Sequence, residues 1–374
     1  QLTFLGTSAG VPTKQRNVTA LAIECLNPYQ ANSKQHSISQ NKRSRPWLLI
    51  DCGEGTQQQL LHTKLSLQQL LAICITHVHG DHCYGLPGLL ASAAMSGRTE
   101  PLTIIATKAI EKLIEAVSLT TDLYLPFAIE FIAIEDILSN ENRNFNQENS
   151  KNVTVHSNGK IAIDLGSQQL NIDITPLSHR VPSHAFGITQ TIIQQLLNTE
   201  KLKANGIAAG KLWGELQQGR DVCTEQGQQL LSADYVHEEK LQTRIVVAGD
   251  NDTPACLSTA VQEADLLVHE ATYTAEVLTK IKSKNLEFDP MHSSAEQVAK
   301  FAEDSGINNL ILTHFSARYQ SFDNPESSTA NMSHIRLEAE SSYQGNLWLA
   351  ADFAQYLVNG ADNQVEYLGS AKNN

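Results

Sequence analysis

An apolar run that ends in a cluster of histidine and aspartate residues constrains the fold of this chain more than any other feature. Residues 70–75 read Leu-Leu-Ala-Ile-Cys-Ile, which is typical of a buried strand. Directly after it come four potential metal ligands: His77, His79, Asp81 and His82. Imidazole nitrogens and carboxylate oxygens suit Zn²⁺, and Gly80 allows a tight change of direction within the loop. The sequence therefore predicts a metal site at the end of a strand, followed by a helix over residues 86–94.

Three later strands are expected to end in further metal ligands. Residues 170–175, 245–248 and 310–312 form β-type runs, and the ligand-type residues that follow them are His179, Asp250 and His314. Together with the first loop they supply five imidazoles and two carboxylates, which suffice for two metal sites that share one carboxylate. Six other histidines lack such settings, and we expect no metal role for His36, His62, His156, His184, His237 and His334.

Short β-rich runs alternate with amphipathic helical stretches, and this alternation indicates an α/β fold. Early strands are expected over residues 2–5, 19–25 and 47–50. The 374 residues, 41% of them hydrophobic, suit one large domain with insertions or two modest domains. Segments rich in Asn, Gln and Ser favour surface insertions at 27–46 and 139–160. The first is basic, so a loop that touches RNA is an alternative to a solvated loop; its basic residues are Lys34, Lys42, Arg43 and Arg45.

Composition favours a protein of the cytoplasm without a membrane partner. No stretch approaches the roughly 18 apolar residues that a membrane span needs, and the first residues lack the pattern of a signal peptide. The six cysteines have no C-x-x-C spacing and are expected to be reduced thiols: Cys25, Cys52, Cys74, Cys83, Cys223 and Cys256. The net charge of -13 argues against a polyanionic partner on average. A local basic patch or bound metal cations can still supply an attractive field.

These motifs, in this order, resemble the metallo-β-lactamase superfamily and, within it, the ribonuclease Z family. The superfamily likeness rests on Asp51 in an Asp-x-Gly motif, on the His-x-His-x-Asp-His loop and on the three later ligands, over nearly the whole chain. The narrower likeness rests on residues 6–17, 85–90, 210–219, 269–272 and 292–294. The resemblance implies an αβ/βα four-layer sandwich in which residues 1–374 form a single catalytic domain. It also implies a protruding arm for binding tRNA over approximately 194–236, although Ile207 to Gly210 lacks the prolines usual in that arm.

The resemblance further implies how two zinc ions would share the ligands. One ion would be held by His77, His79 and His179, the other by Asp81, His82 and His314. Asp250 would bridge both ions, and Asp51 would support the metal loop from behind. Mn²⁺ or another divalent ion is an alternative to zinc.

Catalytic roles are implied for three residues. Asp81 would accept a proton from the attacking water, and His292 would protonate the departing oxygen while Glu270 holds its imidazole. The local sequence fits this arrangement, because Ser293 or Ser294 can cap a helix over 295–304. His292 is therefore expected close to a helix N-terminus, where a phosphate is favoured.

The activity implied by the resemblance is removal of the 3′ trailer from precursor tRNA, which leaves a 3′-hydroxyl on the tRNA, in a homodimer. Lys14, Arg16 and Asn17 would contact the substrate, with solvation at the surface as the alternative. A related hydrolase of a small phosphodiester, sulfate or thiolester would share the metal motif, because a fold does not fix a substrate. A relative that only binds RNA would be expected to have lost some ligands, whereas all seven are present.

Overall fold

The computed structural model describes residues 1–27, 45–139, 147–148, 152–166, 168–284 and 288–372. Within them, one sheet has eight strands in the order β21-β20-β1-β3-β4-β5-β6-β7, and another has nine in the order β19-β17-β16-β15-β12-β11-β10-β9-β8. The first comprises β1 (Leu2–Gly6), β3 (Ala20–Glu24), β4 (Trp47–Ile50), β5 (Leu70–Cys74), β6 (Leu102–Ala106), β7 (Ile129–Ala133), β20 (Ala354–Asn359) and β21 (Gln364–Ser370). The second comprises β8 (Gln147–Glu148), β9 (Val153–Val155), β10 (Ile161–Asp164), β11 (Gln168–Leu177), β12 (Ser183–Leu197), β15 (Val236–Ala248), β16 (Leu266–Glu270), β17 (Asn309–Thr313) and β19 (Asn346–Leu349).

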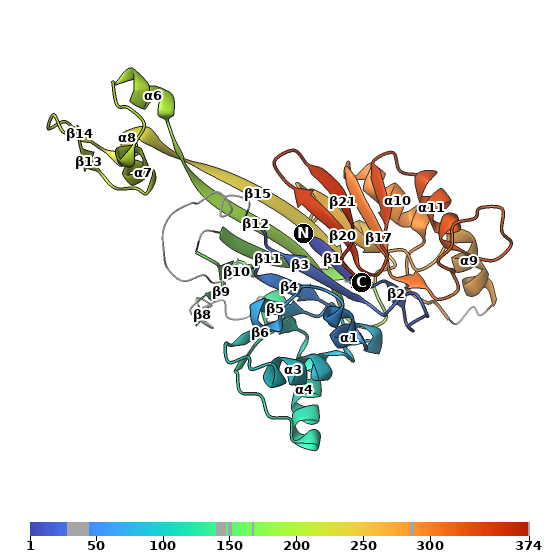
Figure 1. Ribbon diagram of the computed structural model, residues 1–374. Coiled ribbons are helices and arrows are strands. Elements are labelled where there is room, and N and C mark those ends of the chain that lie inside the picture. Colours follow the sequence, from blue (N-terminus) through green and yellow to red (C-terminus); the bar gives the residue numbers. More distant parts are fainter. Residues whose placement is uncertain (28–44, 140–146, 149–151, 167, 285–287, 373–374) are drawn as a thin grey trace.

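The two sheets pack face to face, and helices cover the outer face of each (Figure 1). Both faces of each sheet are covered because alternate side chains of a strand point to opposite faces. In β3, Leu21 and Ile23 lie in the core between the sheets, whereas Ala20 and Ala22 pack under the helices of the first sheet. Those helices include α1 (Thr56–Leu61), α3 (Leu86–Met95) and α4 (Lys108–Thr121). The second sheet is covered by α10 (Ala295–Asp304) and α11 (Met332–Glu340). The predicted four-layer αβ/βα sandwich is confirmed.

Shorter elements connect these layers. The helices among them are α2 (Gly80–Cys83), α5 (Ile134–Leu138), α9 (Ala275–Lys284), η2 (Leu67–Gln69) and η3 (Pro254–Leu257). Strand β2 (Ser8–Ala9) pairs in parallel with β18 (Phe315–Ser316), which joins the N-terminal loop to the segment that follows β17.

The strand directions bring the carboxyl ends of several strands to one edge. Strands β4, β5 and β6 are parallel in the first sheet, and β15, β16 and β17 are parallel in the second. Strand β11 runs in the direction of β15, because both are antiparallel to β12. Crevices outside the carboxyl ends of parallel strands are the usual ligand sites of such sheets. Every predicted metal ligand follows one of these strand ends.

The strands predicted at 2–5, 19–25, 47–50 and 70–75 are confirmed to within one residue at each end. The strand predicted at 245–248 was too short, because β15 begins at Val236. Strands β12 and β15 are paired along their length, from the pair Ala185 and Ala248 to the pair Leu197 and Val236. They extend away from the two sheets as a two-stranded ribbon (Figure 1). Most of residues 236–244 are partly or fully exposed, so the backbone ladder, and not an apolar pattern, defines that part of the strand.

A small folded unit lies at the far end of this ribbon (Figure 1). It contains α6 (Thr199–Ala204), α7 (Lys211–Gln217), β13 (Val222–Cys223), β14 (Gln229–Leu230) and α8 (Ser232–Tyr235). Five buried side chains give it a core of its own: Leu202, Ile207, Leu216, Leu230 and Tyr235. The protruding arm expected from the sequence is therefore present, with the ribbon as its stem.

The predicted insertion at 27–46 lies mostly outside the described residues. Part of the other, at 139–160, forms β8 and β9 and extends the second sheet at its edge. The six cysteines are free thiols, four of them buried, as expected. No helix within the described ranges has the length and apolar character to cross a bilayer.

Helix α10 begins with a capping box that the sequence predicts. Ser294 Oγ accepts a hydrogen bond from Gln297 N at 3.2 Å, and Gln297 Oε1 accepts one from Ser294 N at 2.9 Å. We expect Ser294→Ala to lower the free energy of unfolding by about 1 kcal/mol, because a backbone N–H loses its partner. Urea denaturation would measure this. Ser305→Ala, at the exposed C-terminal end of the same helix, is the control and should change stability little.

Candidate metal centre and active site

Four side chains from three strand ends converge on the first candidate metal position. His77 and His79 follow β5, His179 follows β11 and Asp250 follows β15. Nδ1 of His79 lies 3.1 Å from Nε2 of His77 and 3.3 Å from Nε2 of His179. Asp250 Oδ2 lies 3.6 Å from Nε2 of His77 and 3.7 Å from Nε2 of His179. Four donor atoms therefore surround one point.

A second set lies on the other side of Asp250. Asp81 and His82 belong to α2, and His314 follows β17. Nε2 of His82 and Nε2 of His314 are 3.2 Å apart, and each is 3.3 Å from Asp250 Oδ1. Asp81 Oδ2 is 3.5 Å from Nε2 of His82 and 3.3 Å from Nε2 of His314. Asp250 thus directs one oxygen toward each set.

These spacings fit two tetrahedral ions. Zinc bonds of about 2.0–2.2 Å to nitrogen or oxygen place neighbouring ligand atoms about 3.3–3.6 Å apart at the corners of a tetrahedron. Asp250 Oδ1 is buried and has no hydrogen-bond donor among the described residues. A buried carboxylate oxygen without a donor is costly, and a bound cation removes that cost. The residues present therefore fit a two-metal site.

Hydrogen bonds behind the ligands fix the imidazole tautomers. His82 Nδ1–H donates to Asp51 Oδ2 at 2.7 Å, and His179 Nδ1–H donates to the carbonyl oxygen of Met291 at 2.8 Å. His314 Nδ1 lies 3.0 Å from the hydroxyl of Thr272, which itself donates to Glu270 Oε2 at 2.5 Å. Each arrangement leaves Nε2 with a free lone pair facing the metal position.

Asp51 lies behind the loop that carries His77 and His82. Its two carboxylate oxygens accept from the backbone N–H and the hydroxyl of Thr76, at 2.8 and 2.9 Å. Asp51, Met291 and His314 have φ angles of 59°, 54° and 57°, which are unfavourable for residues other than glycine. Such strain is concentrated at functional sites, where the surrounding contacts hold it in place.

Sequence reasoning missed three of the contributors to this arrangement. Thr76 and Thr272 orient ligands through a hydroxyl group, and Met291 does so through its carbonyl group. The only sequence hints of these roles are that Thr76 directly precedes His77 and that Thr272 lies in the segment 269–272. His184 is buried and its ring nitrogen lies 3.0 Å from the carbonyl oxygen of Thr76, outside the donor sets. The other four described histidines for which no metal role was expected are also outside these sets.

The charges in the site favour a cation. Burial alone would raise the pKa of Asp250, but His314 and His82 hold it well below its usual value. Burial would likewise lower the pKa of His82, but Asp250 and Asp51 hold it well above. The carboxylates therefore attract positive charge to this pocket, and a metal ion that binds there displaces the proton from the imidazole.

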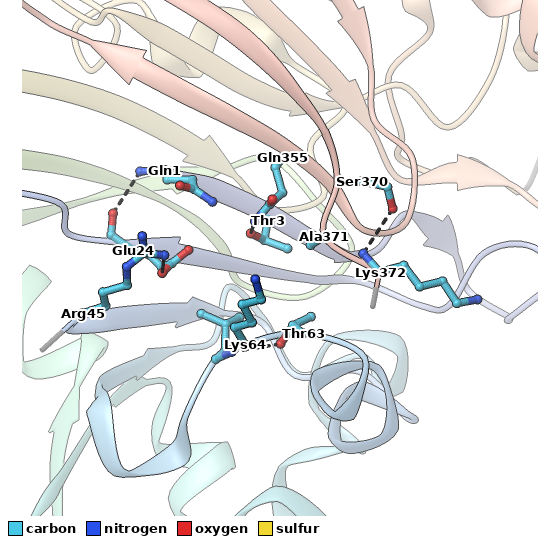
Figure 2. Close-up of a pocket in the computed structure, with 11 residues that line it drawn as sticks. Gln1, Thr3, Glu24, Arg45, Thr63, Lys64, Gln355, Ser370, Ala371 and Lys372 are labelled. Atoms are coloured by element: carbon cyan, nitrogen blue, oxygen red, sulfur yellow. Dashed lines mark hydrogen bonds and ion pairs between the residues drawn. The ribbon is translucent and has the colours of Figure 1, made fainter. Parts of the chain in front are cut away.

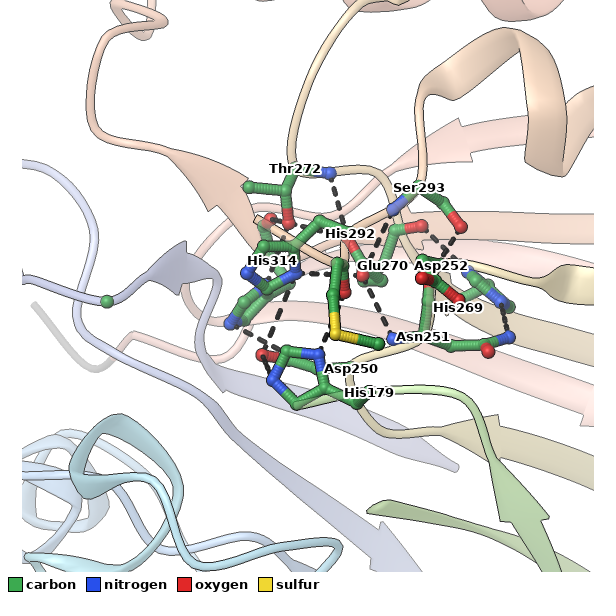
Figure 3. Close-up of polar contacts among 12 residues, drawn as sticks. His179, Asp250, Asn251, Asp252, His269, Glu270, Thr272, His292, Ser293 and His314 are labelled. Carbon is green, nitrogen blue, oxygen red and sulfur yellow. Dashed lines mark hydrogen bonds and ion pairs between the residues drawn. The ribbon is translucent and has the colours of Figure 1, made fainter. Parts of the chain in front are cut away.

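Glu270 and His292 form a pair beside the metal positions (Figure 3). His292 Nδ1–H donates to Glu270 Oε1 at 2.9 Å, and the same oxygen accepts from Asn251 N at 3.0 Å. Asp250 and Glu270 are buried, whereas the side chain of His292 is 16% exposed. Burial alone would lower the pKa of His292, but the Glu270 and Asp250 carboxylates raise it to about 9. The pair therefore presents a protonated imidazole at the edge of the metal centre.

His292 also lies near enough to Asp250 and His314 to be considered as a ligand. Its Nδ1, however, is 3.8 Å from Asp250 Oδ2 and already bonded to Glu270. Its ring stands between those of His179 and His314, with centroid distances of 5.2 and 5.5 Å. This position at the open side suits proton transfer better than coordination.

The N-terminal loop reaches the metal centre through its backbone. Gly10 N–H donates to Asp81 Oδ2 at 2.7 Å, a contact that sequence reasoning missed. Of the predicted substrate contacts, Lys14 is exposed and Asn17 is half-buried. Arg16 is only 5% exposed, and its guanidinium donates to the carbonyl oxygens of Ser316 and Tyr319 at 3.1 and 2.7 Å. This buried position argues against a direct contact between Arg16 and substrate.

A separate hollow of about 230 Å³ lies at the opposite end of β1 (Figure 2). Its lining is mostly polar and includes Glu24, Arg45, Lys64 and Lys372. Arg45 Nη1 and Glu24 Oε1 are 3.3 Å apart. The hollow shares no residue with the two donor sets, so it is distinct from the candidate active site.

Comparisons with known proteins agree with this geometry. A family model described as anti-Pycsar protein Apyc1 matches residues 29–124, which is less than half of the chain. Solved structures with a similar fold include the short form of human tRNase Z, with a TM-score of 0.54, 23% identity and coverage of 94% of this chain and 96% of that one. The metallo-β-lactamase fold protein YhfI from Bacillus subtilis has a TM-score of 0.53 and 15% identity, with the same coverage of both chains. At these identities the two structures establish the fold.

Curated relatives establish more. The chain is 42% identical to ribonuclease Z of Marinobacter nauticus over 95% of both proteins. It is also 42% identical to ribonuclease Z of Pseudomonas putida, over 98% of this chain and 99% of the relative. It is 34% identical to ribonuclease BN of Escherichia coli, over 85% of this chain and 90% of the relative. With this identity over nearly full length, the chain belongs to the ribonuclease Z family of metallo-β-lactamase-fold hydrolases.

Proposed function

We propose that this protein is a metal-dependent endoribonuclease that removes the 3′ trailer from precursor tRNA and leaves a 3′-hydroxyl on the tRNA. One observation carries the proposal: two sets of metal-ligand atoms share Asp250, and the Glu270–His292 pair stands beside them. Membership of the ribonuclease Z family supports RNA as the substrate. We place the cleavage of precursor tRNA in the cytoplasm, which that membership supports.

We assign two zinc ions to the site, with manganese or another divalent ion as the alternative. One would be held by His77, His79, His179 and Asp250, and the other by Asp81, His82, His314 and Asp250. When bound, such ions lower the pKa of a water molecule toward neutrality and offset the negative charge of a phosphodiester. Asp51, Thr272 and the carbonyl group of Met291 keep the ligand imidazoles in the required tautomers.

The protein's own proton-transfer groups are Asp81 and His292. Asp81 Oδ2 is engaged by Gly10 N–H and faces two imidazoles, which leaves Oδ1 to accept a proton from the attacking water. Burial favours the neutral form of Asp81, but the neighbouring imidazoles of His314 and His82 hold its pKa well below the usual value. His292, kept protonated by Glu270, donates a proton to the 3′ oxygen of the tRNA as it leaves.

The arm and the N-terminal loop complete the proposal. The ribbon of β12 and β15 carries a folded tip away from the metal centre, which suits contact with a part of tRNA distant from the cut. Lys14 is exposed on the loop that reaches Asp81 and is the residue of that loop we assign to a phosphate contact. We also propose a homodimer, as the family resemblance implies.

The test is cleavage of a precursor tRNA with a 3′ trailer by purified protein of known metal content. A cut next to the discriminator base or CCA end, lost in Asp81→Ala and kept in the control Asp136→Ala, would support the proposal. Asp136 is exposed, pairs with Lys108 and belongs to neither donor set. Intact RNA together with hydrolysis of a small phosphodiester, sulfate or thiolester would instead favour the alternative enzyme.

The role of Glu270 predicts a change in pH dependence. Protonated His292 is the form that can donate, so activity falls as the pH rises through the pKa of His292. Glu270→Gln removes the carboxylate charge that raises this pKa, so the alkaline fall in kcat should move to lower pH. A pH–rate profile at constant metal content would measure it. In Glu338→Gln, whose carboxylate instead accepts the N–H groups of Ala275 and Glu296, the fall should stay where it is. An unmoved profile in Glu270→Gln would contradict the assignment.

A further inference from the structure

Two exposed arginines beside the metal centre each lie over an aromatic ring. Arg180 directly follows the ligand His179, and its guanidinium carbon is 5.0 Å from the ring centroid of Phe288. Arg318 lies four residues after the ligand His314, and its guanidinium carbon is 5.1 Å from the ring centroid of Tyr273. Each stack fixes the plane of a guanidinium group and leaves N–H groups at its edge free to bind an anion.

The rest of each side chain is also held. Arg180 Nη2 donates to the carbonyl oxygen of Asp289 at 2.8 Å, and Arg318 Nε donates to Ser316 Oγ at 3.1 Å. Within the described residues, no carboxylate oxygen lies within 4 Å of either guanidinium group. Arginine N–H groups fixed in this way lose little conformational freedom when they bind a phosphate.

The segment 288–294, which contains His292, connects the two stacks. Phe288 is four residues before His292, in the segment whose Met291 carbonyl holds His179. Tyr273 is bridged through the backbone to Ser294, two residues after His292, and its ring centroid is 6.1 Å from that of His292. A polyanion that lies along this segment therefore passes both arginines and the proton donor.

From this arrangement we infer that Arg180 on Phe288 and Arg318 on Tyr273 bind the two RNA phosphates that flank the scissile linkage. The inference rests on the proposed function. The site itself is rich in carboxylates, and the whole chain has a net charge of -13, so neighbouring phosphates need local cations to approach. The metal positions serve the reacting phosphate, and the two arginines serve its neighbours.

The experiment neutralises one RNA phosphate at a time. Two precursor tRNAs carry a single methylphosphonate, with a 2′-deoxy sugar at that position, on the 5′ or the 3′ side of an unmodified cleavage site. Wild-type protein should lose about tenfold or more in kcat/KM with either substrate, because a charge-assisted hydrogen bond is lost. Arg180→Ala and Arg318→Ala should each become insensitive to one of the two replacements and remain sensitive to the other.

Controls separate this inference from the proposed function. Arg336→Ala, an exposed arginine of α11 that pairs with Asp323, should respond to both replacements as the wild type does. Metal analysis of each variant would identify loss of the site, and Arg318→Lys and Arg180→Lys should restore part of the sensitivity, since the charge is kept. Arginine variants that remain as sensitive as wild type to both replacements would overturn the inference while leaving the nuclease assignment intact. Failure of the wild type to cut the unmodified precursor would overturn the nuclease assignment itself.

Discussion

His292→Ala should keep the metal content of the protein and lower kcat for precursor tRNA by about 10²- to 10⁴-fold, the usual contribution of a positioned acid. The physical reason is the position of the imidazole: its Nδ1–H is bonded to Glu270 at 2.9 Å, while Nδ1 lies 3.8 Å from Asp250. The variant therefore removes a proton donor without removing a member of either four-atom donor set. Elemental analysis and single-turnover cleavage would measure the two effects separately.

The control for this experiment is His156→Ala, an exposed histidine between β9 and β10. It should match the wild type in both measurements. Loss of one metal ion from His292→Ala would mean that this residue is a ligand, which the distances argue against. Undiminished turnover with full metal content would remove its role in proton transfer.

Asp250→Ala is expected to have the larger effect, since one side chain serves both donor sets. Without Asp250, each donor set loses an oxygen that lies 3.3–3.7 Å from its imidazole nitrogens. The site also loses a negative charge that would attract a divalent cation to its five histidines. We expect loss of most bound metal after dialysis and cleavage below detection. Asp250→Asn keeps the shape of the side chain but loses its charge. This variant should bind metal weakly, and its cleavage activity should lie between those of Asp250→Ala and the wild type.

Asp252→Ala is the matched control, because Asp252 lies on the same loop and its carboxylate accepts only from the hydroxyl of Thr253 among the described contacts. Its metal content should equal that of the wild type. Full retention of both metals by Asp250→Ala would show that the bridging arrangement is wrong.

The convergence of the two donor sets could be predicted from sequence because each member follows a strand, and parallel strands bring their carboxyl ends together. The groups that orient the ligands could not, since the carbonyl group of Met291 comes from a segment 112 positions away from His179. A hydroxyl such as that of Thr272 carries no pattern of its own, and only the folded distances reveal its partner.

Two other differences have similar causes. The strand at 245–248 was predicted too short, because β15 beyond the body is exposed on most positions and lacks the apolar alternation that identifies a strand. Arg16 was expected at the surface because arginine is rarely buried without a partner. Its partners are backbone carbonyl groups of the segment around β18, which the sequence gives no means of locating.

The separate core at the tip of the arm has a consequence for how this enzyme can change. The chain enters and leaves the tip through the directly paired residues Leu197 and Val236, and the five core residues of the tip all lie between them. Substitutions there are insulated from the packing of the two sheets. Replacing the tip with a tight turn or with the tip of a relative should therefore leave the two sheets folded. On the proposed role of the arm, such a replacement changes which RNAs are bound.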